Sequence, residues 1–139
     1  MKKNILLTIM VLCSAMTMAQ GKYYVSTSQQ GERFEIVQSP IVRADCFKLD
    51  KYRGRVYQIA KTKDDNMIWE YVEVEDLDTI NQLYSVNDSI NYQLFMGGMV
   101  RADCYLLHVR SGATWVLVKR SDDTTFFQKM ETYIYFIDY

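Results

Sequence analysis

Short runs of alternating apolar and polar residues, separated by turn-forming residues, make up most of the chain beyond its first segment. These runs are rich in Val, Ile, Tyr and Phe, and period-two alternation is typical of strands with one buried face. The runs that we interpret as strands are 34–37, 43–50, 55–61, 67–74, 113–120 and 125–131, with flanking candidates at 22–27 and 133–138. Gly54, Gly112 and two Asp-Asp turns separate neighbouring runs. The pattern therefore predicts an all-β, mainly antiparallel protein.

One segment departs from this period. Within 76–84, Leu77, Ile80 and Leu83 recur at helical spacing. This spacing predicts a short amphipathic helix, and an irregular loop is the alternative.

The chain also repeats itself. The segment VRADC occurs at 42–46 and again at 100–104, an offset of 58 residues. Positions 34–73 align with 92–131 without a gap, and 11 of these 40 pairs are identical. We interpret this as the duplication of one unit of about fifty residues.

A four-strand unit of that size buries too little apolar surface to be stable alone. Two units can fold together if their apolar faces meet, which predicts a pseudo-two-fold sandwich or barrel. We therefore expect one β domain over 20–139. Its parts are repeat one at about 32–75, a linker at 76–89 and repeat two at about 90–133.

Both copies carry the pattern Phe/Tyr-x-Leu-Asp-x-x-x-Gly-x-x-Tyr/Trp. It starts at Phe47 in the first copy and at Tyr105 in the second, where His108 stands in place of Asp. This pattern resembles a hairpin module of uncharacterised exported proteins of Bacteroides-type bacteria. The resemblance covers most of the chain beyond its first segment and implies an exported β protein. It brings no known activity, so no functional residue is carried over.

The first segment has the features of a signal peptide. A basic start is followed by an apolar stretch at 5–16, too short to span a bilayer comfortably, and then by small residues up to Ala19. We expect cleavage after Ala19, which removes 1–19 and leaves a periplasmic or extracellular protein. No other apolar run reaches the length of a transmembrane helix.

The composition excludes one class of partner but does not indicate an activity. The hydrophobic fraction of 49% is ordinary for a folded protein. The chain carries 16 Lys and Arg against 17 Asp and Glu, a formal charge of −1. It thus lacks the basic footprint of a nucleic-acid-binding protein, and we expect no nucleic-acid partner.

Cys46 and Cys104 occupy equivalent positions in the two copies. Disulfides persist in exported proteins, so a bond between these residues is one alternative, and it requires their Cα atoms to lie within about 7 Å. The other alternative is two buried thiols inherited through duplication. We expect no metal site, because no Cys or His neighbours either thiol and the acidic turns lack EF-hand spacing. Nor do we expect a cofactor.

Asp45 and Asp103 are also equivalent, and each lies two residues after an arginine, Arg43 or Arg101. Residues two apart share a strand face, so each Arg–Asp set could form an ion pair. A symmetric carboxylate pair could instead serve hydrolysis, but no supporting motif accompanies it. The single histidine, His108, is expected at the surface or rim. We therefore assign no catalytic residue.

Aromatic residues exceed what one small core can hold, with 11 Tyr, 6 Phe and 2 Trp. Some should be exposed, where they suit sugar stacking or protein contacts. The candidate binding residues are Tyr52, Tyr57, Trp69 and Trp115, although we expect both tryptophans mainly in the core.

Together these features favour an exported, non-catalytic binding or protein-interaction module. Its partner would be a protein, as for an enzyme inhibitor, or a carbohydrate. The alternatives are a small secreted hydrolase using Asp45 and Asp103, and a self-assembling structural module.

Overall fold

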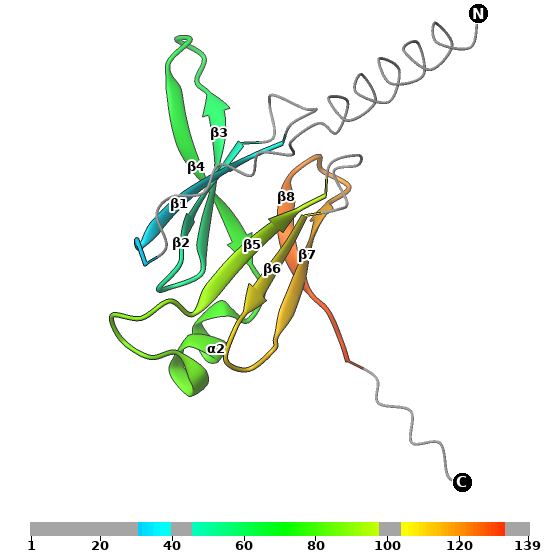
Figure 1. The fold of residues 1–139 in the computed structure, drawn as a ribbon. Helices are drawn as coiled ribbons and strands as arrows, with labels where there is room; N and C mark the ends of the chain where they lie inside the picture. Colours follow the sequence, from blue (N-terminus) through cyan, green and yellow to red (C-terminus); the bar gives the residue numbers. More distant parts are fainter. Residues whose placement is uncertain (1–30, 40–45, 98–103, 133–139) are drawn as a thin grey trace, which may run out of the picture.

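The structure is a computed structural model that describes residues 31–39, 46–97 and 104–132. Eight strands and one helix follow one another along this part of the chain (Figure 1). The first four strands are β1 (Phe34–Gln38), β2 (Cys46–Asp50), β3 (Arg55–Lys61) and β4 (Met67–Val74). After the helix α2 (Leu77–Tyr84) come β5 (Tyr92–Met96), β6 (Cys104–His108), β7 (Thr114–Lys119) and β8 (Thr125–Lys129). The helical interpretation of 76–84 is confirmed, and β3 and β4 have their predicted bounds.

The strands form one sheet in the order β1-β2-β3-β4-β8-β7-β6-β5. Within each half, consecutive strands pair antiparallel. The halves join through a parallel pair, β4 and β8, in which Glu73 lies opposite Phe126 and Val74 opposite Phe127. The result is a nearly closed mixed barrel built of two similar, hairpin-rich halves, which confirms the predicted fold class.

A single apolar core fills the barrel. The first half contributes Val37, Phe47, Leu49, Val56, Val72 and Val74, and the second contributes Tyr92, Leu94, Cys104, Leu106, Trp115, Leu117 and Phe127. Leu77 and Ile80 of α2 complete the core. They hold the helix across one end of the barrel, while the β3–β4 hairpin projects at the other end (Figure 1).

The two halves bury opposite faces. Ile36 of β1 is exposed and Val37 is buried, whereas their equivalents on β5 behave in reverse, with Leu94 buried and Phe95 exposed. The cause is the parallel junction: placing the last strands of the two halves side by side and parallel turns one half over relative to the other. The apolar faces that meet in the core are therefore non-equivalent faces of the repeat.

Parts of the sequence interpretation lie outside the described residues. These are the segment 1–19, the flanking strands at 22–27 and 133–138, and the beginning of the strand predicted at 43–50. A helix that could span a bilayer, which requires about 20 apolar residues, is not found among the described residues.

Candidate functional site

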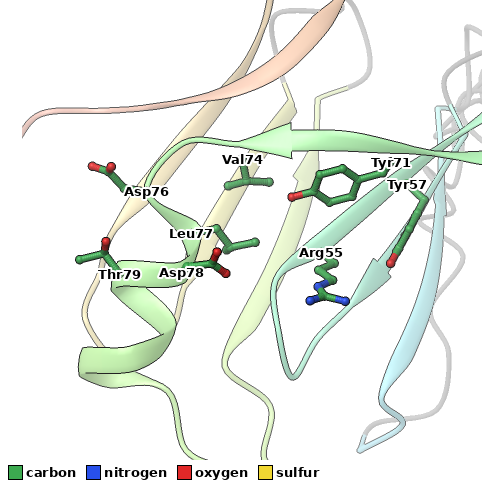
Figure 2. A pocket seen from close by; sticks show the side chains of 8 residues that line it. All are labelled: Arg55, Tyr57, Tyr71, Val74, Asp76, Leu77, Asp78 and Thr79. Carbon is green, nitrogen blue, oxygen red and sulfur yellow. The ribbon is translucent and has the colours of Figure 1, made fainter.

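A pocket of about 480 Å³ lies between the outer face of β3 and β4 and the start of α2. Its lining consists of Arg55, Tyr57, Tyr71, Val74, Asp76, Leu77, Asp78 and Thr79, and we call it the Tyr71 pocket. Asp76 adopts the left-handed conformation, with φ of 54°, which Asp tolerates better than most residues. This residue turns the chain out of β4 so that the first turn of α2 faces the sheet (Figure 2).

Aromatic side chains form the wall of the pocket on the sheet side. Tyr57 and Tyr71 are cross-strand partners, and their rings meet edge to face with centroids 5.8 Å apart. The Lys48 ammonium lies over Tyr57 at 4.7 Å and over Trp69 at 5.2 Å. Side chains alternate between the two faces of a strand. Because Val56, the residue before Tyr57, points into the barrel, the Tyr57 ring lies on the outer face.

Tyr71 offers the most accessible ring of this wall, with half of its surface exposed. Partial burial raises the pKa of its hydroxyl above the ordinary value. The hydroxyl therefore stays protonated at neutral pH, and it can both donate and accept a hydrogen bond.

Charges of opposite sign face each other across the pocket. Arg55 is the first residue of β3, directly after the Gly54 turn, and Asp78 lies in the first turn of α2. Figure 2 shows Arg55 on the sheet side of the pocket and Asp78 on the helix side. Within the described residues, neither Arg55 nor Asp78 takes part in an ion pair. Both groups are therefore available to a ligand.

A second hollow, of about 550 Å³, continues from the same two residues. Arg55 and Asp78 line both spaces, and beyond them the second hollow is lined by Tyr52, Arg53 and Asn81 among others. We call it the Tyr52 hollow.

A chain of hydrogen bonds fixes α2 to both halves of the barrel beneath this hollow. Asn81 Nδ2 donates to the carbonyl of Arg53 at 2.9 Å. Asn81 Oδ1 accepts from the Tyr92 hydroxyl at 3.0 Å and from Ser85 Oγ at 2.7 Å. Burial raises the pKa of Tyr92 to about 12, so its hydroxyl remains a donor throughout the physiological range.

The placement of His108 was predicted wrongly. Its side chain is fully buried, not at the surface or rim. The Ser111 backbone N–H donates to Nδ1 at 3.1 Å, so a neutral imidazole carries its proton on Nε2. Nε2 lies 3.2 Å from Ser85 Oγ and donates to it. Because the ring donates a hydrogen bond to this hydroxyl and does not accept one from it, His108 and Ser85 are not arranged as a base and its nucleophile.

His108 occupies the position that Asp50 holds in the first half, and both serve the turn that follows. Asp50 Oδ1 accepts from the N–H groups of Tyr52 and Arg53, as His108 Nδ1 accepts from Ser111. Arg33 adds a bidentate contact to Asp50 at 2.8 and 3.1 Å. Burial alone would raise the pKa of this carboxyl, but the hydrogen bonds from Arg33 and the turn outweigh burial and lower it. Burial, together with Arg110, lowers the pKa of His108.

The four candidate binding residues are separated by the fold. Tyr57 lines the Tyr71 pocket and Tyr52 lines the neighbouring hollow. Trp115 is fully buried, as expected, and its Nε1 donates to the Glu75 carbonyl at 2.7 Å. The expectation for Trp69 was wrong: it is only partly buried and lies on the outer face beneath Lys48.

Cys46 and Cys104 are not joined by a disulfide in this structure. Cys104 belongs to the core, whereas strand alternation puts Cys46 on the outer side, the side of Lys48. The inversion of faces between the halves therefore separates the two thiols. Burial raises the pKa of the Cys46 thiol, which keeps it protonated.

Asp45, Asp103 and their arginines, Arg43 and Arg101, lie outside the described residues. Within the described residues, no group of three or more His, Cys, Asp or Glu side chains could hold a metal ion.

Sequence patterns did not single out Arg55, Tyr71 or Asp78 as site residues. The available signal was Tyr71, because β4 has apolar residues on both faces and one of those faces must lie outside the core. Arg55 and Asp78 carry no local signal, since only the packing of α2 brings them together.

Comparison with protein-family models, with curated proteins and with solved structures found no match to this chain.

Proposed function

We propose that this protein is an exported, non-catalytic binding module that recognises a carbohydrate in the Tyr71 pocket. One observation carries the proposal: an exposed tyrosine ring lies beside a guanidinium and a carboxylate that face each other without pairing. The basic and apolar character of 1–19 supports export.

Opposed charges favour a ligand that donates and accepts at once. An anion would be attracted by Arg55 but repelled by Asp78, and a cation would meet the reverse. A sugar hydroxyl avoids this conflict, because it can accept from the guanidinium and donate to the carboxylate. The apolar C–H face of a pyranose can at the same time pack on the Tyr71 ring.

The carboxylates of the pocket are unsuited to glycoside hydrolysis. That reaction requires one carboxyl group that holds a proton for the leaving group, which burial normally provides. The side chain of Asp76 is instead 58% exposed and lies 3.3 Å from the Lys129 ammonium. An exposed carboxylate in contact with an ammonium does not provide the buried acid that this reaction requires, which supports binding without cleavage.

A panel of soluble neutral oligosaccharides tests the proposal. The panel comprises gluco-, xylo-, manno- and arabino-oligosaccharides, and binding to the protein without residues 1–19 is followed by NMR chemical shifts. At least one member should bind and shift the amides around Tyr57 and Tyr71. Tyr71→Ala should weaken this binding roughly fivefold to tenfold, the worth of one aromatic contact.

Phe95→Ala is the matched control. Phe95 is 49% exposed, like Tyr71 at 50%, but lies on the outer face of the second half. This substitution should leave the affinity unchanged. Absence of binding by every panel member at millimolar concentration, or equal loss in both variants, would overturn the proposal.

A further inference from the structure

The Tyr71 pocket does not end at Arg55 and Asp78. These two residues also line the Tyr52 hollow, so the two spaces adjoin at this pair. Each space falls within the range of about 300–1,000 Å³ that is usual for small-molecule sites. Each is thus large enough to hold a ligand unit of its own.

The Tyr52 hollow repeats the chemistry of its neighbour. An aromatic ring, Tyr52, lines it together with side chains of both signs, including Arg53 and Asp88. Arg53 has no ion pair among the described residues. A ring with unpaired donors and acceptors beside it again suits a pyranose with its hydroxyls.

The hollow is also held in shape before any ligand arrives. Arg33 is fixed by its two contacts with Asp50, and its guanidinium lies over the Tyr52 ring at 5.5 Å. Asn81, in the wall, is held by Arg53, Ser85 and Tyr92. A site whose side chains are fixed in advance loses less free energy in ordering when it binds.

We infer that the ligand is a chain of at least two sugar units that crosses the Arg55–Asp78 pair. One unit lies in the Tyr71 pocket and the next in the Tyr52 hollow. This inference rests on the proposed function, because it concerns the same ligand. It adds a prediction of its own, namely that affinity depends on chain length.

The test is a chain-length series on the full barrel. The probes are glucose, cellobiose and cellotriose, and the matching xylose, mannose and arabinose series, titrated by NMR. In the series that binds, the disaccharide should bind roughly fivefold to tenfold more tightly than the monosaccharide. Tyr52→Ala should abolish this gain while leaving monosaccharide affinity unchanged, and Tyr71→Ala should weaken binding of every member.

Tyr84→Ala provides the control, because Tyr84 is a half-exposed tyrosine on α2 that lines neither space. It should change neither the affinity nor the gain. If Tyr52→Ala impairs folding, judged by amide dispersion, Arg53→Ala should reduce the same gain.

The outcomes separate the two proposals. If mono- and disaccharides bind equally well, or if Tyr52→Ala and Arg53→Ala both retain the gain, the second subsite is wrong and the proposed function stands. If no probe of any length binds, the proposed function and the inference both fall.

Discussion

The two halves of this barrel carry the same strand pattern and use it in opposite ways. Tyr57 and Trp115 are equivalent positions, yet Tyr57 borders an open pocket on the outer face and Trp115 is fully buried in the core. Lys48 and Leu106 differ in the same way, since Leu106 is buried and Lys48 lies over aromatic rings outside. Similar sequence therefore specifies similar strands and turns in the two halves, while the junction between the halves decides which face becomes core.

Trp115→Ala and Tyr57→Ala give the largest contrast between the halves. Loss of the buried indole should lower the free energy of unfolding by about 4 kcal/mol, because it leaves a cavity and an unpaired Glu75 carbonyl. Loss of the outer ring should cost about 1 kcal/mol. Urea denaturation measures both, and similar costs would contradict the inversion of faces.

Substitution by Ala at the two turn glycines should also differ in its cost to stability. Both have positive φ, 69° at Gly54 and 75° at Gly112, so Ala costs about 1 kcal/mol at either position. A Cβ at Gly54 would in addition lie 2.7 Å from the buried Tyr92 ring, whereas nothing lies within 4 Å at Gly112. We expect Gly54→Ala to cost about 3 kcal/mol in total. Equal melting temperatures for the two variants would show that the two turns are packed alike.

The smallest contrast is in pH dependence. The folded pKa of His108 lies below its ordinary 6.5, so its contribution to stability is complete above pH 6.5 and is lost as the pH falls below that value. The pKa of Asp50 lies below 3.8, so its contribution is complete above that value and is lost only at lower pH.

Asn at either position keeps an acceptor for the turn N–H groups and removes the titration. His108→Asn should therefore flatten the decline in the free energy of unfolding below pH 6.5, and Asp50→Asn should alter only the decline below pH 4. Denaturant titrations at pH 7.5, 5.5 and 3.5 measure both effects. If the free energy of unfolding of His108→Asn declines below pH 6.5 as steeply as that of the unaltered protein, another group causes the acid sensitivity.

Much of the fold follows from local pattern. Alternation and turn residues defined β3 and β4, and helical spacing defined α2. The buried faces could not be derived in this way, because strands such as β1 have apolar residues on both sides. From the sequence alone, either Ile36 or Val37 could face the core. The parallel pairing of β4 with β8 decides between them.

The candidate site was less accessible to sequence reasoning. Tyr52 and Tyr57 were found because aromatic residues exceed the core's capacity. Arg55 and Asp78 come from segments that only the placement of α2 brings together. His108 was misplaced because spacing along its strand does not reveal Ser85 and Ser111, the partners that make its burial possible.

The parallel junction also bears on the order of folding. Among the described strands, every other pairing joins neighbours in sequence, and such hairpins close quickly at small entropic cost. Only β4 and β8 must find each other across the intervening helix and three strands. We therefore expect two meanders to form early and their docking to limit the rate. Until Val74 meets Phe127, neither meander has an enclosed core, and this step commits the chain to its barrel.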